Sequence, residues 1–292
     1  MNDICCYSTI NSDLDILQRS DVGEADFKII LHIQHAAISG YKNIFVLSSD
    51  TDVVVLALYF FQKFTESNLK TLWFQVVSGK SSRNIPLHKI FSHYGESFCS
   101  ILPALHQLTG SNYTSNVGTK YSALLADPLD YLQNFGQDVT ELSIEQSVEC
   151  AEEYLVRVLT SSLRYKTFDQ LRYHEYKYSI CSLVEDLPPT SNSIKLHILR
   201  ALYIVYEQTH IFENNFGELN PIDFGWDEED DMLIPKKSHL LFPPIEDLVP
   251  QCTDTTCSRS CVCVSFGVKC CSFCNCEIMI CVKTYNKNII NR

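Results

Sequence analysis

The sequence lacks a hydrophobic run long enough to cross a membrane. Its longest uninterrupted apolar stretch, from Val53 to Phe61, is far shorter than the roughly 20 apolar residues that a spanning helix needs. Residues 1–20 also lack the cationic start and apolar core of a signal peptide. We therefore expect a nuclear or cytoplasmic protein that is not secreted and has no membrane partner.

Positive charge is scarce as well, because 23 lysines and arginines face 35 aspartates and glutamates, for a net charge of −12. This excludes a uniformly basic nucleic-acid-binding surface, although a local basic patch is compatible with it. Hydrophobic residues make up 46% of the chain and charged residues 20%, which is typical of a globular protein. The 292 residues suffice for one large domain or two small ones.

Cysteine is sparse over the first 251 residues and then abundant. Nine of the 14 cysteines lie between Cys252 and Cys281. Without a secretory signal we expect a reducing compartment, where such a cluster indicates a metal site before it indicates disulfides.

The N-terminal pattern predicts alternating helices and strands. Apolar spacing over residues 24–39 favours a helix that ends at Gly40, and Asn43–Leu47 favours a buried strand. Residues 53–64 favour a second helix, and Thr71–Val77 favour a second strand. This alternation predicts an α/β fold with a parallel sheet.

From Ile85 onwards the pattern is helical. Two short helices joined at Gly95 precede a loop and another helix, and residues 143–185 and 193–210 continue as long helices. Residues 214–251, with their acidic run, are typical of a linker that contains proline. Histidines 88, 93 and 106 fall on the short helices, where we expect packing rather than phosphate contact.

Four carboxylates are expected to meet at one edge of the sheet. Asp50 and Asp52 follow the first strand, and Glu24 and Asp26 begin the preceding helix. Ligands of parallel sheets collect beyond the carboxyl ends of the strands, and clustered carboxylates favour Mg²⁺ or Mn²⁺. Such ions promote phosphodiester hydrolysis. Helix capping and turn chemistry also explain these residues, so both interpretations stand.

The order of these parts resembles the internal region of the flap-endonuclease/XPG family over about residues 20–127. The matching motifs are E-A-D-x-x-I from Glu24, S-S-D-T-D, L-T-G-S-N-Y and V-G-T-K. The resemblance implies a PIN-like domain with a helix-hairpin-helix element that grips DNA. It further implies catalytic, metal-binding roles for Glu24, Asp26, Asp50 and Asp52, and DNA contact by Gly118 and Lys120.

Two departures from the family pattern reduce the expected activity. The aspartate of the family's G-C-D-Y segment falls on Asn112, which removes a charge. The family's first strand and its upstream acids are missing from this sequence. We therefore expect a Mg²⁺-dependent endonuclease or phosphodiesterase site that is weak or inactive. Whether a protein partner supplies the missing N-terminal elements stays open.

The C-terminal cysteines predict a zinc module. Thiolates this dense are satisfied by tetrahedral Zn²⁺, which also supplies the folding energy that so short a segment lacks. Two or three ions that share sulfurs fit the number of thiolates, and the role of Cys271 stays open. The predicted ligands are Cys252, Cys257, Cys261, Cys263, Cys270, Cys274, Cys276 and Cys281.

This spacing resembles the CXC motif of tesmin-like proteins, with Pro250 in place of the first cysteine and a longer final spacing. The family binds zinc and contacts DNA, which implies DNA contact by basic residues such as Arg259 and Lys269. A scaffolding zinc knot without DNA contact is the alternative. The whole arrangement resembles a group of transposon-related animal proteins.

Four regions follow from these motifs: a PIN-like region at 1–135, a helical extension at 136–213, an acidic linker at 214–251 and a CXC-type module at 252–281. The predicted function is a degenerate nuclease-like protein with a tail that contacts DNA. The alternatives are a non-catalytic chromatin-binding protein that acts through the CXC module and a truncated transposon relic.

Overall fold

The computed structural model describes residues 15–17, 23–78, 81–160, 163–178, 187–213 and 219–238. The predicted zinc module and its ligands lie outside these residues. The chain divides into two compact units, of which the first comprises residues 1–164 and 195–237 and the second residues 165–194 and 238–292. Among the helices that the structure describes, none is both long and apolar enough to span a membrane.

The first unit contains a mixed three-stranded sheet. Strand β1 (Asn43–Leu47) pairs in parallel with β2 (Thr71–Ser78), so the two predicted strands and their parallel pairing are confirmed. Strand β3 (Ser81–Pro86) pairs antiparallel with β2 and was not predicted. Its sequence, S-S-R-N-I-P, lacks the apolar alternation that marks a strand. The fold is therefore α/β with a mixed sheet rather than a purely parallel one.

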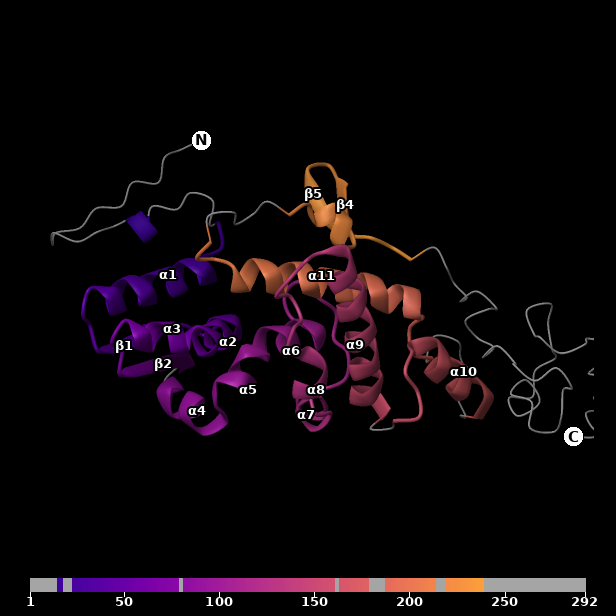
Figure 1. Cartoon of the computed structure of the whole chain (residues 1–292), viewed down its shortest axis with the longest axis horizontal. Coiled ribbons are helices and arrows are strands. Elements are labelled where there is room, and N and C mark those ends of the chain that lie inside the picture. The colour runs from indigo at the N-terminus through magenta and orange to yellow at the C-terminus, as the bar shows by residue number, and fades with distance from the viewer. Residues whose placement is uncertain are drawn as a thin grey trace, which may run out of the picture. The chain divides into compact units, whose positions relative to one another are not determined.

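Three helices cover one face of this sheet (Figure 1). They are α1 (Ala25–Ile38), α2 (Thr51–Tyr59) and α3 (Phe61–Glu66), and they correspond to the two helices predicted here. Side chains from all three pack with those of the sheet in one hydrophobic core. Its fully buried members, such as Leu56, Phe64 and Leu72, each stabilise the fold by about 1.5–3 kcal/mol through removal from water.

A run of helices follows the sheet and completes the first unit. The hydroxyl of Tyr154 on α9 donates a 3.0 Å hydrogen bond to the carbonyl of Ala123 on α7, which ties these two helices together. The elements are α4 (Leu87–Tyr94), α5 (Glu96–Ser100), α6 (Leu102–Leu108), α7 (Lys120–Leu125), α8 (Leu129–Leu132), α9 (Glu141–Thr160) and most of α11 (Ser191–Thr209).

The expected acidic linker differs from the structure. Residues 221–235 form a 3₁₀ turn (Pro221–Phe224) followed by a hairpin of β4 (Trp226–Glu229) and β5 (Met232–Pro235). Trp226 is buried under the guanidinium of Arg200, which donates a 3.0 Å hydrogen bond to the carbonyl of Gly225. The acidic run is thus the exposed strand and turn of a hairpin anchored by one tryptophan.

The described part of the second unit is small. Helix α10 (Phe168–Tyr178) is joined to the start of α11 by two reciprocal hydrogen bonds. The amide of Asp169 donates to Ser191 Oγ, and the amide of Ser191 donates to Asp169 Oδ1, both at 3.0 Å. These bonds satisfy backbone donors in the first turn of each helix.

We expect Gly136→Ala to destabilise the protein by about 3 kcal/mol, because Gly136 has φ +76° and an added Cβ would lie 2.6 Å from Val205 Cγ1. Gly40→Ala is the matched control, since Gly40 has φ +91° but open space around it, and should cost only about 1 kcal/mol. Urea denaturation measures both. If both variants lose the same free energy of unfolding, the close contact with α11 is not the reason for the glycine at position 136.

Candidate functional site

Three of the four predicted carboxylates converge. Asp26 lies in the first turn of α1, and Asp50 and Asp52 lie at the start of α2, just beyond the carboxyl end of β1. One ligand oxygen from each lies within 4.8 Å of the others. Asp50 is also the N-cap of α2, because its Oδ1 accepts a 2.9 Å hydrogen bond from the Asp52 amide. Helix capping by Asp50 is therefore confirmed, and its role in a metal site stays a prediction.

Glu24 lies beside this group rather than in it. The hydroxyl of Tyr113 donates a hydrogen bond to its side chain. Burial raises the pKa of this tyrosine to about 12, and the charge of Glu24, the hydrogen bond and the nearby aspartates add to the shift. Glu24 is also one of the charges that act on Asp26. The structure thus brings together Asp26, Asp50 and Asp52 and leaves Glu24 at their border.

The clustered carboxylates repel one another when they are ionised. The pKa of Asp26 rises from 3.8 to about 6, first through burial and then through the charges of Asp50, Asp52 and Glu24. A divalent cation among these carboxylates would remove the repulsion and favour their ionised forms. Hard oxygen donors at this spacing fit Mg²⁺ or Mn²⁺.

Two of these carboxylates, Asp50 and Asp52, line a polar cleft of about 430 Å³. Its walls join the start of α2 to the end of α6 and to the loop before α7. The cleft also contains Asn112. The lining residues are Ser49, Asp50, Thr51, Asp52, His106, Gly110, Ser111, Asn112, Asn116 and Lys120.

His106 is a member of the site that sequence reasoning missed. Its Nε2 lies 2.5 Å from Oδ1 of Asp52, which is 5% exposed. The contact is a short hydrogen bond between an imidazole nitrogen and a carboxylate oxygen. We expected packing for this histidine. Since no motif spacing links residues 52 and 106, only the folded arrangement shows the contact.

Lys120 has a structural role at the end of α6. Its ammonium donates three hydrogen bonds of 2.7–2.8 Å, to the carbonyls of His106 and Gly110 and to Thr109 Oγ1. Burial lowers its pKa to about 8, and the charge of Asp52 opposes this shift. To contact a phosphate, the Lys120 ammonium would have to break one of these three hydrogen bonds.

Gly118 is required by packing. Its φ is +67°, and an added Cβ would lie 2.5 Å from Val158 Cγ1 on α9. The predicted DNA contacts Arg259 and Lys269, like the eight cysteine ligands, lie outside the described residues.

No protein-family model matches the chain, and neither a curated protein nor a solved structure matches it. The function is therefore inferred from the chemistry of the residues.

Asp26→Asn is expected to stabilise the protein above pH 6 by about 1 kcal/mol, after allowance for solvent screening. A carboxyl whose folded pKa is raised contributes stability at pH values below its ordinary pKa of 3.8. That contribution is lost as the pH rises through about 6. The gain from Asp26→Asn should therefore appear over this range and vanish below it. Thermal or urea unfolding against pH checks this, with the exposed Asp223→Asn as control. A gain that is independent of pH would contradict it.

Proposed function

We propose that the first unit is a PIN-like domain with a divalent-cation site related to that of structure-specific nucleases. The observation that carries this proposal is the convergence of Asp26, Asp50 and Asp52 at the carboxyl end of β1. Asp26 lies on α1, before β1, and Asp50 and Asp52 lie 24 and 26 positions later, at the start of α2. All three meet beyond the carboxyl end of β1, where ligands of parallel sheets usually bind. The cleft with Asn112 and Lys120 supports the same assignment.

The residues that line the cleft or lie beside it divide into two chemical groups. Asp26, Asp50 and Asp52 would hold Mg²⁺ or Mn²⁺, which supplies an activated water and stabilises a departing phosphate oxygen when bound. The side chains of Asn112 and Asn116 offer neutral hydrogen bonds to a phosphate or sugar, whereas the hydroxyl of Ser111 already donates a hydrogen bond to Gln107 Oε1. His106 holds Asp52 in place through its hydrogen bond.

The charge of the site explains why we propose weak or absent catalysis. Asn112 contributes an amide to the cleft where the family has a carboxylate. Three carboxylates can neutralise one divalent ion, but a two-ion clamp on both reacting oxygens needs more negative charge. The proposed site thus binds one ion and acts on nucleic acid slowly or only as a binding surface.

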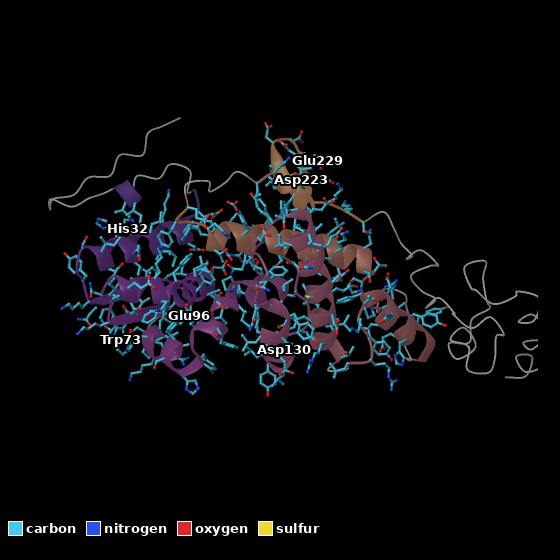
Figure 2. All side chains as sticks on the ribbon, in the orientation of Figure 1. His32, Trp73, Glu96, Asp130, Asp223 and Glu229 are labelled. Carbon is cyan, nitrogen blue, oxygen red and sulfur yellow. The ribbon has the colours of Figure 1, made fainter. Side chains whose placement is uncertain are left out.

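The test combines metal binding and cleavage. Wild-type protein should bind Mn²⁺, and Asp50→Asn/Asp52→Asn should not, because both substitutions remove a negative charge. The variant should still fold, because asparagine caps a helix as well as aspartate does. Asp130→Asn/Asp223→Asn is the matched control, with both carboxylates exposed and outside the cleft (Figure 2). Labelled single-stranded, flap and duplex DNA are incubated with each protein and Mg²⁺ or Mn²⁺. Mn²⁺ binding that is equal in wild type and the site variant would refute the cation site.

For the C-terminal region we propose a CXC-type zinc module that contacts DNA and acts in the nucleus. The cysteine spacing from Cys252 to Cys281 supports zinc binding. Five basic residues against two acidic ones over 252–292 support phosphate contact, in contrast to the negative charge of the whole chain. If the cation site is only structural, this module carries the non-catalytic, chromatin-binding function.

Metal analysis of the purified full chain should find about two or three zinc ions per chain. Cys263→Ser/Cys276→Ser should lower this number, whereas Cys99→Ser/Cys150→Ser should not, because these two free cysteines lie far from the cluster in sequence. A content below one zinc per wild-type chain would exclude the module. DNA binding that is undiminished after deletion of residues 252–292 would exclude its role in DNA contact.

A further inference from the structure

One face of the three-stranded sheet carries exposed aromatic side chains. Side chains alternate between the two faces of a strand. Val46 of β1 and Leu72 and Phe74 of β2 belong to the hydrophobic core that the sheet forms with α1–α3. Phe45 and Trp73, which are paired in register, therefore project from the opposite face. Parallel strands are normally covered on both faces, so exposed aromatic residues at this place indicate an interaction surface.

Three rings form a row on this face. Phe45 stacks on Trp73, with 5.9 Å between the ring centroids and 7° between the ring planes. Trp73 in turn contacts His88 of α4 edge to face, with 5.2 Å between the centroids. The Nδ1 atom of His88 lies 3.0 Å from the carbonyl oxygen of Leu72, which fixes the imidazole. Phe45 ends the row and is 65% exposed, so a further aromatic ring can stack on it.

Amide side chains lie beside these rings. The hydroxyl of Thr71 donates a 2.8 Å hydrogen bond to Asn43 Oδ1, and the two residues are paired in register next to Phe45 and Trp73. Gln75 of β2 and Asn84 of β3 are also paired in register. Gln75 follows Trp73 by two residues, so both amides lie on the same face as the rings. Amides form hydrogen bonds with the polar edges of nucleobases.

The charge around the rings is positive, unlike that of the whole chain. Residues 41–49 and 67–95, which include the sheet and α4, contain no aspartate or glutamate, whereas the chain has a net charge of −12. Lys42 and Lys70 lie next to each other, because the Lys42 carbonyl accepts a 2.8 Å hydrogen bond from the Lys70 amide. This surface therefore complements a polyanion. The exposed cations of these segments are Lys42, Lys70, Arg83 and Lys89.

We propose that this face binds single-stranded nucleic acid, with a base stacked on Phe45 and phosphates beside Lys42 and Lys70. Proteins hold single strands by stacking bases on aromatic side chains and by placing cations along the backbone. A duplex keeps its bases stacked on one another and offers no ring to Phe45. An apolar protein partner would cover Phe45 and leave the cations without counter-charges.

This binding surface is distinct from the carboxylate cleft. None of the residues that line the cleft belongs to the row of rings or to the amides beside it. The surface is also distinct from the cysteine-rich region, which lies about 160 residues further along the chain. The proposal therefore does not rest on the cation site or on the zinc module.

Tryptophan fluorescence of Phe45→Trp in the full chain tests the stacking. Without added divalent cations, oligo(dT) or oligo(rU) should lower the emission of the introduced indole about twofold, because a base stacks on it, and a duplex of equal length should not. Comparison of the two strands shows whether DNA or RNA binds more tightly. Leu142→Trp is the matched control, since Leu142 is 66% exposed on α9, and its emission should not change. No quenching of Phe45→Trp by either strand, or equal quenching by the duplex, overturns the proposal.

The salt dependence of this quenching tests the cations. Lys42→Gln, made in the Phe45→Trp protein, should weaken binding and reduce the slope of log affinity against log salt by about 0.7, the value for one phosphate of a single strand. Lys237→Gln is the control, because Lys237 is exposed and follows β5, and it should leave the slope unchanged. A slope that Lys42→Gln leaves unchanged contradicts the proposed position of the phosphates.

Discussion

The parallel pairing of β1 with β2 is the constraint on which the rest of the first unit depends. Two adjacent parallel strands need a crossover connection, and α2 and α3 supply it on the face that α1 also covers. The crossover begins at Asp50, so the turn that leaves β1 also positions Asp50 and Asp52. One connection therefore fixes the hydrophobic core and the carboxylate cluster together.

The end of α6 is the second organising point. Its last carbonyls would be unsatisfied in a free helix. Here Thr114 Oγ1 donates to Gln107 O, His197 Nε2 contacts Leu108 O at 2.9 Å, and Lys120 covers His106 and Gly110. Four segments thus meet at one helix end, and the loop that lines the cleft is held from both sides. The loop between α6 and α7, which is polar in sequence, is therefore held in place and forms one wall of the cleft.

The features that were predicted from sequence are those with a strong local signal. The apolar run of β1, the acidic turn after it and the amphipathic pattern of α1 each identify their element without tertiary information. Strand β3 and the β4–β5 hairpin were missed, because β3 and β4 are mostly polar and β5 is only four residues long, so that their pairing depends on neighbours. His106 was assigned to packing for a related reason, since its contact with Asp52 joins residues 54 positions apart. Long-range contacts between polar residues leave no periodic pattern.

The position of the two tryptophans has a spectroscopic consequence. Trp73 lies partly exposed on β2, against His88 of α4 (Figure 2), and Trp226 lies buried beneath Arg200 in the hairpin. The sequence contains no others, and both belong to the first unit. Intrinsic tryptophan fluorescence is therefore a selective reporter of that unit. An unfolding curve followed in this way describes the α/β fold and its hairpin and contains no direct signal from the second unit.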